Sequence, residues 1–570
     1  MPVRGFARSH SQRQVGYQSA GPLYQLAGLN EDENPLALRP DQLRKANNCA
    51  RKGSMTGTRP CVAYPGGDYA AALAAGTPIC GIHQYSTDRG ASTYRLLTIS
   101  NGNVYIDDDV ANILDKATNS IEITGGQNFL WTIADFQDQV WATGGDIDGT
   151  DHIWYWDGTN PLGRLNLGLA ENPRYIFEKW NFLFLGGLNG TAVDDNPMLA
   201  RYCNYGADAT DSLNWPSANS LPGNLLNENF GVGSYGSEYN TGFGSFGGPD
   251  SDHLLFLTNK RIFAYHPNPN MQGSSSAFAL ADTIPIGCVG QDAYVDLGVD
   301  VGDAVFLSSN GVHSVSQSLQ YGDRLSAYLS WPIRRTWDTI NRSRLQYAQG
   351  AYWPTEGMVL FAVSTGSNTH HNLILCLDIK GVDRLTPDNV RWYKWELNGM
   401  DVNKLQVARG PDDKPYVYVG GLLGEVTRFD RDAYADLATG GPSVEIQTRD
   451  EDYGLPSREK GLGDLFVALQ GKGNYRIQYT SILDDGQTPG QSSLLEVPDV
   501  GGVWGDSWGA LQWGTTNVTQ RQRVPNVGDS VTIGHKFSHA GANEPFWLGV
   551  IDQQVSVSGP TDDAEANTVG

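Results

Sequence analysis

Short runs of alternating apolar and polar residues, joined by tight turns, recur along most of the chain. One pair runs from Leu96 to Ser100, turns at Asn101–Gly102 and returns from Val104 to Ile106. An Asn-Gly turn between β-forming runs is a strong hairpin signal, because both central residues of such a turn adopt positive φ. Pairs of the same kind are 254–257 with 262–265, 305–308 with 312–315, 416–419 with 426–429, 139–142 with 153–156, and 358–363 with 373–377. The pattern predicts an all-β protein.

The hairpins recur at a spacing that suggests repeated units. Asn259 and Asn310 are 51 positions apart, and Asn101 and Trp154 are 53 apart. A period near ~50 residues with several short strands per unit is typical of propeller blades. Six or seven such units fit into residues 70–432, so we predict a β-propeller of six or seven blades and leave the blade count open.

Two stretches interrupt this pattern. Residues 231–250 (GVGSYGSEYNTGFGSFGGPD) are too rich in glycine for a blade turn, and we expect an inserted loop there. A helix is predicted around 331–344, since Pro332 fits a first helical turn and Ile333, Trp337 and Ile340 fall on one face.

The two ends of the chain differ from the middle. Residues 1–69 are expected to form an extended N-terminal arm. Beyond residue 433 the alternating runs Leu465–Leu469, Tyr475–Tyr479 and Phe546–Val550 predict a C-terminal domain like a β-sandwich, over 433–558. The polar tail 559–570 is expected to be disordered.

Composition narrows the classes of function. The 570 residues hold 40 Lys plus Arg against 63 Asp plus Glu, a formal net charge of −23. This balance argues against a protein that wraps DNA by neutralising phosphates. No run reaches the ~20 apolar residues of a transmembrane helix, so no membrane span is expected. The six cysteines form no C-x-x-C pair, which favours buried free thiols over zinc or a disulfide framework.

The candidate chemical motifs are weak. Residues 231–236 and 242–247 both match Gly-x-Gly-x-x-Gly, but a dinucleotide site requires this motif between a strand and a helix, and a flexible loop is favoured here. Residues 146–151 resemble half of a calcium loop, yet Tyr155 occupies the position of the distal Glu, which favours a turn with solvated acids. His370 and His371 are adjacent and cannot readily share a metal. We therefore predict no catalytic, cofactor-binding or metal-binding residues, no cofactor, and no enzymatic activity.

Residues 28–60 hold an ordered set of motifs: Gly28–Asn30, Asn34–Leu43, Asn47–Asn48, Gly53 and Arg59–Pro60. This order resembles the N-terminal signature of bacteriophage tail proteins. Two later stretches are Phe306–Val312, followed by the predicted helix and Ala351–Pro354, and Gly454–Pro456 with Lys460. They are similar to tail nozzle proteins of short-tailed phages, a family also called tail tubular protein B or packaged-DNA stabilisation protein.

The resemblance implies a structural protein of the virion tail, made in the host cytoplasm. Such a protein forms a homohexameric ring below the head-to-tail adaptor, encloses the DNA ejection channel, helps to retain the packaged genome and offers sites for tail fibres. DNA passes through the channel without sequence-specific binding. The charge adds a hypothesis of its own: acidic side chains line the bore and repel phosphate. The alternative, that the charge serves solubility, stays open.

Two other functions stay open. The first is a tail-tip module that binds a host receptor or glycan, with sugars stacking on Phe230, Tyr235, Tyr239, Phe243 and Phe246. The second is a propeller enzyme that degrades polysaccharide.

Overall fold

The structure, a computed structural model, describes residues 18–19 and most of 26–557. The longer stretches outside the described residues are 66–75, 87–93, 108–113, 117–129, 145–152, 166–172, 188–197, 222–237, 269–276, 322–327, 498–519 and 558–570. The described chain is mostly β-strand, arranged in many small sheets, which confirms the predicted all-β class. No helix in these described ranges is long and apolar enough to span a membrane.

Four antiparallel sheets follow one another from residue 79 to residue 284. Their strands are β7 (Ile79–Ser86), β8 (Tyr94–Ser100), β9 (Asn103–Asp107) and β10 (Leu114–Lys116); β11 (Thr132–Phe136), β12 (Gln139–Thr143), β13 (Ile153–Trp156) and β14 (Gly163–Leu165); β15 (Tyr175–Lys179), β16 (Phe182–Gly186) and β17 (Ala200–Tyr202); and β18 (Asn240–Phe246), β19 (His253–Thr258), β20 (Ile262–Pro267) and β21 (Phe278–Ile284). Within each sheet every strand pairs antiparallel with the next along the chain, as in a series of hairpins.

Three further groups of strands continue this series. They are β22 (Tyr294–Asp296), β23 (Ala304–Leu307) and β24 (Val312–Ser314); β25 (Gln349–Trp353), β26 (Met358–Val363), β27 (Leu373–Asp378) and β28 (Arg391–Trp395); and β29 (Val402–Arg409), β30 (Pro415–Gly421) and β31 (Val426–Asp430). The last group is completed by β6 (Cys61–Ala63), which comes from the N-terminal part of the chain and pairs antiparallel with β31. All six predicted hairpins are present.

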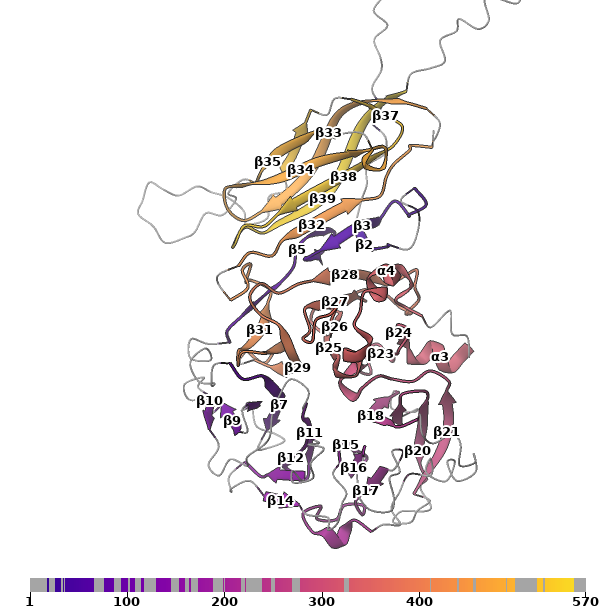
Figure 1. Cartoon of the computed structure of the whole chain (residues 1–570), viewed down its shortest axis with the longest axis vertical. Helices are drawn as coiled ribbons and strands as arrows, with labels where there is room; N and C mark the ends of the chain where they lie inside the picture. The colour runs from indigo at the N-terminus through magenta and orange to yellow at the C-terminus, as the bar shows by residue number, and fades with distance from the viewer. Residues whose placement is uncertain are drawn as a thin grey trace, which may run out of the picture.

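The first strands of these seven groups contact one another in a cycle. Along the described chain β7 contacts β11, then β15, β18, β22, β25 and β29 follow in turn, and β29 contacts β7. Apolar side chains fill the space between neighbouring groups: Ile79 and Ile82 of the first pack with Tyr418 and Val426 of the last. The groups occupy the lower part of Figure 1.

The C-terminal strands form two packed sheets in the upper part of Figure 1. They are β32 (Val444–Thr448), β33 (Lys460–Gly471), β34 (Tyr475–Leu483), β35 (Ser492–Val497), β36 (Gln520–Val524), β37 (Gly528–Ser530), β38 (Ile533–His539) and β39 (Phe546–Val557). Leu465 and Val467 of one sheet share a core with Ile477 and Phe537 of the other. Alternation of buried residues along β34 is what a strand with one covered face requires.

N-terminal strands are built into these C-terminal sheets. β3 (Gln42–Asn47) pairs with β32 on one side and with β28 on the other, so one continuous sheet runs from β25 to β35. β2 (Ala27–Leu29) lies beside β3, while β4 (Cys49–Lys52) and β5 (Met55–Thr58) join β39 in the second sheet, which β1 (Gln18–Ser19) also joins. Residues 26–63 thus link the cycle of sheets to the C-terminal sheets.

The single helix predicted around 331–344 is wrong. The structure has three short helical segments, η4 (Trp331–Ile333), α4 (Arg334–Asp338) and η5 (Arg342–Tyr347). The chain leaves the helix after Thr339 because Ile340 forms an isolated β-bridge with Thr365, and the Asn341 side chain then accepts from the Ser343 amide, 3.2 Å away, as the cap of η5. The predicted apolar face is confirmed, since Ile333, Trp337 and Ile340 are all buried. A second helix, α3 (Val315–Tyr321), was not predicted.

The loop predicted at 231–250 is wrong for its second half. Residues 240–246 form β18, the first strand of the fourth sheet, while 231–237 lie outside the described residues. The glycines here serve close packing: a Cβ on Gly242 would lie 2.7 Å from the Cα of Gln291, and one on Gly244 would lie 2.6 Å from the Tyr294 ring. Glycine therefore lets β18 approach the fifth group of strands.

Candidate functional site

The two adjacent histidines have separate structural partners. His371 is buried, with Nδ1 3.0 Å from the Ser364 hydroxyl and Nε2 2.8 Å from the Tyr347 carbonyl oxygen. Burial lowers the pKa of His371 to about 4, so the ring is neutral at pH 7. His370 instead faces Asp401 at 3.4 Å. The described residues hold no group of three or more His, Cys, Asp or Glu side chains placed to bind a metal ion, and 146–151 lies outside them.

The aromatic residues proposed to stack on sugars do not form one exposed surface. Phe243 is buried and packs against Phe184 and Phe256, with ring centroids 6.1 and 5.8 Å away. Tyr239 is exposed, Phe246 is partly buried, and Phe230 and Tyr235 lie outside the described residues. The role proposed for Phe243 is wrong, because its ring is part of the core. The glycine motif at 242–247 likewise lies in and just after a strand, and the next described element, β19, is also a strand.

The six cysteines are all buried and none forms a disulfide, as predicted. Burial raises the pKa of Cys203 to about 11 and that of Cys61 and Cys288 to about 12. These thiols are protonated at neutral pH and are poor nucleophiles.

A buried polar cluster lies where the cycle of sheets meets the C-terminal sheets. Arg59 is fully buried and all five of its N–H groups are bonded. Nε donates to Asn48 Oδ1 at 3.1 Å, Nη1 to Asp436 Oδ1 at 3.0 Å and to the Pro60 carbonyl at 2.9 Å, and Nη2 to Asp436 Oδ2 at 2.5 Å and to the Glu396 carbonyl at 2.6 Å. Such a bidentate pair fixes both distance and orientation.

Asp436 and Asn48 extend this contact to neighbouring backbone. Asp436 also accepts from the amides of Val62 and Asn398 at 3.1 and 3.0 Å. Asn48 accepts from the Glu396 amide at 2.7 Å and donates to the Ser443 carbonyl at 3.0 Å. Burial opposes the charge on Arg59, but Asp436 outweighs it and the pKa of Arg59 is raised. We call Asn48, Arg59 and Asp436 the junction cluster. It joins the N-terminal segment, the end of β28, and the chain between β31 and β32.

A second contact holds the N-terminal segment against the short helices. Glu31 accepts from the Thr336 amide at 3.0 Å and hydroxyl at 2.7 Å, and Lys394 Nζ lies 2.7 Å from the other Glu31 oxygen. Nearby, a Cβ on Gly28 would lie 2.6 Å from the Arg391 Cα, so only glycine allows this approach to β28. Both Gly28 and Arg59 belong to the segment that carries the family resemblance.

One mouth of the cycle of first strands is cross-linked by polar side chains. A β-bulge between Val402 and Lys404 precedes the main run of β29. Lys404 is buried and its Nζ lies 2.7 Å from Asp292, just ahead of β22, and 3.4 Å from the Trp131 carbonyl, just ahead of β11. Gln349 at the start of β25 also donates to Asp292, at 3.1 Å. The two bonds of Lys404 join strand groups that are not neighbours in the cycle, whereas the bond of Gln349 joins two neighbouring groups.

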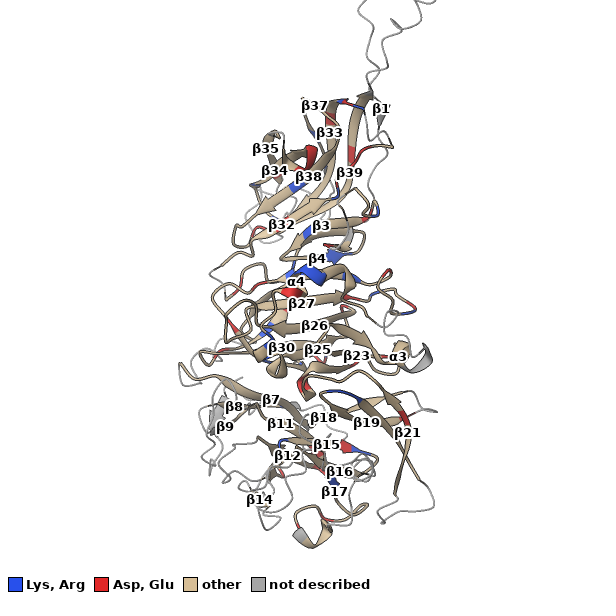
Figure 2. Ribbon diagram, turned by 45° about the vertical axis from the view of Figure 1, so that its right-hand side comes forward, with Lys and Arg blue, Asp and Glu red and all other residues tan. Residues whose placement is uncertain are grey.

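Basic residues gather on β3 and β4, at the level of the junction, as Figure 2 shows. Each of them contacts another part of the chain, and Arg51 donates to the Gly53 carbonyl at 2.7 Å. Lys45 lies 3.1 Å from Glu445, Arg44 contacts Asp450 and Asp485, and Lys52 lies over the Trp547 ring.

Sequence reasoning found part of this arrangement and missed the rest. It marked Asn48 and Arg59 through the family resemblance, without assigning them partners. Asp436, Asp292 and Lys404 were not singled out, because nothing in the local pattern distinguishes them from the other charged residues of the chain.

Comparison with known proteins finds no matching family model and no matching curated protein. Among solved structures, the chain is similar to BBS1N in a complex with ARL6DN, at 11% identity over 66% of this chain and 98% of that chain, with a TM-score of 0.38. It is also similar to an exo-β-1,3-galactanase from Phanerochaete chrysosporium, in complexes with galactotriose and with galactose, at 10% and 11% identity over 77% of this chain and 97% of that chain, with TM-scores of 0.26 and 0.25. Similarities at these scores carry no conclusion about function.

Proposed function

We propose that this protein is a structural component of a bacteriophage tail, the nozzle that forms a ring around the DNA ejection channel below the head-to-tail adaptor. One observation carries the proposal. The segment with the family resemblance holds other parts of the chain together: Gly28 is required by the approach to β28, and Asn48 and Arg59 are hydrogen-bonded inside the junction cluster. A structural role for this segment is what the resemblance implies.

We also propose that the seven groups of strands are the blades of a β-propeller, closed by β6. The contact of β29 with β7 and the pairing of β6 with β31 support this arrangement. In this arrangement the last blade contains β6 from the N-terminal part of the chain, so the two ends of the propeller segment are joined within one blade. The C-terminal sheets would then form the β-sandwich-like domain, anchored to the propeller through β3.

The proposed ring also predicts the electrostatics of the channel. A net charge of −23 per subunit gives six copies a strongly negative field. Acidic side chains at the bore would let DNA slide without binding, and the alternative, a charge that serves solubility alone, predicts a bore without acidic excess. The charge of the side chains that line the bore in the assembled ring distinguishes the two hypotheses.

The test is electron cryomicroscopy of intact particles from the source of the chain, with the protein located by antibody-gold labelling. Label at the distal end of a short tail, with sixfold density, is the expected result. Label on peripheral fibres would instead favour the receptor-binding role. Absence of label from every particle would overturn both, and a reducing-sugar assay on capsule and lipopolysaccharide would then test for an enzyme.

A further inference from the structure

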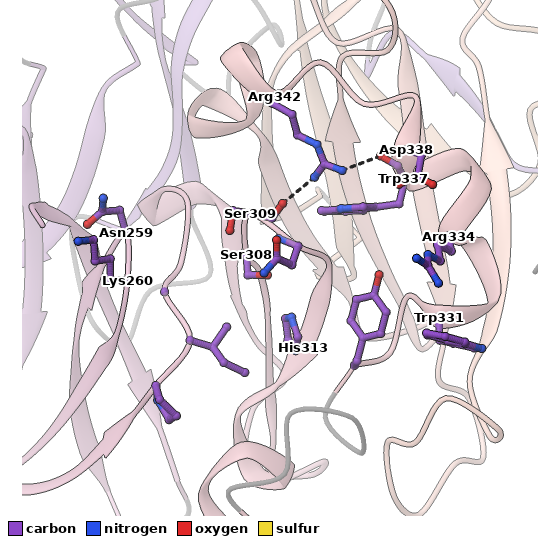
Figure 3. Close-up of a pocket in the computed structure, with 15 residues that line it drawn as sticks. Asn259, Lys260, Ser308, Ser309, His313, Trp331, Arg334, Trp337, Asp338 and Arg342 are labelled. Atoms are coloured by element: carbon purple, nitrogen blue, oxygen red, sulfur yellow. Dashed lines mark hydrogen bonds between the residues drawn. The ribbon is translucent and has the colours of Figure 1, made fainter. Parts of the chain in front are cut away.

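A cleft opens beside the short helices, away from the junction cluster. Its volume is about 570 Å³, and it lies between the β19–β20 turn at Asn259–Lys260, the β23–β24 turn at Ser308–Asn310 and the helical stretch 331–342 (Figure 3). The described residues that line it combine three features: a cationic rim, exposed aromatic rings, and buried nitrogen atoms that lack partners.

The rim is cationic although the chain as a whole is strongly acidic. Lys260, Arg334 and Arg342 line the cleft, with Asp338 as the acidic residue among its lining side chains. Arg342 is held in place, since it donates to the Ser309 carbonyl at 2.6 Å and lies over the Trp337 ring at 5.4 Å. This local excess of positive charge favours an anionic ligand.

Aromatic rings form part of the wall. Trp331 is 40% exposed, and the Tyr328 ring meets it edge-on with centroids 6.1 Å apart. Arg334 lies over the Trp331 ring at 5.3 Å, which places a cation and an aromatic face side by side. An aromatic face in contact with solvent can receive the apolar face of a ligand ring.

Two buried side chains of the cleft have unpartnered nitrogen atoms. His313 is 4% exposed and Trp337 is 1% exposed, and neither ring nitrogen of His313 nor Nε1 of Trp337 has a hydrogen-bond partner among the described residues. Buried polar groups are normally bonded, and these atoms lie unbonded in side chains that line the cleft. Burial lowers the pKa of His313 to about 4, which leaves a neutral ring with one donor and one acceptor. The two nitrogen atoms point away from each other, so one hydroxyl group can bond to only one of them, as donor or as acceptor.

We propose that this cleft binds an acidic sugar residue, with its carboxylate at Arg334, its ring against Trp331 and Tyr328, and its hydroxyls directed toward His313 and Trp337. An inorganic anion offers no ring face to the aromatic wall, and a neutral sugar offers no charge to the rim. All residues of the site belong to one chain, so ligand binding does not require assembly of the ring. The proposal therefore goes beyond the nozzle role, and each of the two can be tested without the other.

The test uses the full-length chain and saturation-transfer NMR titrations with glucuronic acid, with glucose and inorganic phosphate as comparison ligands. Glucuronic acid is expected to bind at least about tenfold more tightly than glucose or phosphate. Arg334→Ala is expected to weaken glucuronic acid binding by about tenfold, corresponding to the loss of one charge-assisted contact. Arg335→Ala is the matched control, because Arg335 is exposed on the same helix and does not line the cleft.

Trp331→Ala adds a readout of stacking, and it is expected to weaken glucuronic acid binding while leaving the weak interaction with phosphate unchanged. Three results would overturn the proposal: no binding of glucuronic acid up to about 10 mM, binding of phosphate as tight as that of glucuronic acid, or equal effects of the Arg334 and Arg335 substitutions. Circular dichroism of each variant separates loss of binding from loss of fold.

Discussion

Arg59 and Asp436 are 377 positions apart in the chain, and they form a bidentate ion pair with both side chains fully buried. The pair closes a junction at which the N-terminal segment passes between the cycle of sheets and the C-terminal sheets. With every N–H of Arg59 bonded, the geometry compensates the cost of burying the two charges only as long as both partners are present.

Removal of one partner should therefore be far more costly than loss of a surface pair. Arg59→Leu leaves Asp436 buried without a cation and is expected to lower the free energy of unfolding by about 3–5 kcal/mol. Urea denaturation measures the change. Arg409→Ala is the control, because the Arg409–Asp413 pair is exposed and should contribute less than about 1 kcal/mol. Similar losses in the two variants would contradict the role assigned to the junction cluster.

Gly28 should tolerate no side chain. A Cβ there meets the Arg391 backbone at 2.6 Å, so Gly28→Ala forces β2 away from β28 and is expected to destabilise the protein by about 1–3 kcal/mol. Gly549→Ala is the matched control within a strand, since its nearest neighbour is the flexible end of Met55 at 3.3 Å. Thermal unfolding of both variants is the measurement, and an unchanged midpoint for Gly28→Ala would show that the two strands can separate freely.

Acid should weaken the fold through His371. Its pKa is about 4 in the folded protein and near ~6.5 when unfolded, so the unfolded state binds the extra proton more readily. The stabilising contribution is complete above about pH 6.5 and is lost as pH falls toward 4, by up to about 3 kcal/mol. His371→Gln should show a smaller drop in unfolding free energy than the wild type over this range. The pKa values of His313 and His535 are also lowered to about 4, so these residues still cause part of the loss of unfolding free energy in the His371→Gln variant. Parallel curves for the two proteins would refute the assignment.

Asp450 should act in the opposite direction. Burial raises its pKa to about 6, and the neighbouring Asp485 and Glu451 add to this, while Arg44 opposes it. The carboxyl group contributes most to stability below about pH 4, and this contribution is lost as pH rises through 6. Asp450→Asn is therefore expected to raise the unfolding temperature at pH 7.5, with no difference from the wild type below about pH 4. A lower unfolding temperature at pH 7.5 would mean that the contact with Arg44 outweighs burial.

Local sequence patterns succeeded where structure depends on neighbours in the chain. β8 and β9 are short β-forming runs that only two residues separate, and β26 (Met358–Val363) and β27 (Leu373–Asp378) are two apolar runs that pair along their length. Predictions from local patterns were wrong where glycine, which is common in loops, instead allows close packing of a strand. Gly242 and Gly244 suggested a loop, but the structure uses them for close packing of a strand. The helix predicted around 331–344 was broken at Ile340 by a bridge to Thr365, a contact that helical periodicity does not encode.

The amino-acid sequence by itself determined the all-β class, most of the hairpins and the apolar face that Ile333, Trp337 and Ile340 bury, because each depends on spacing within about ten residues. Only the tertiary structure decided that β3 lies between β28 and β32, that β6 pairs with β31, and that Arg59 meets Asp436. The physical reason is the same in each case. An unpaired strand edge requires another strand, and a buried charge requires an opposite charge. Many distant residues could meet either requirement, and the packing of the whole chain determines which one does.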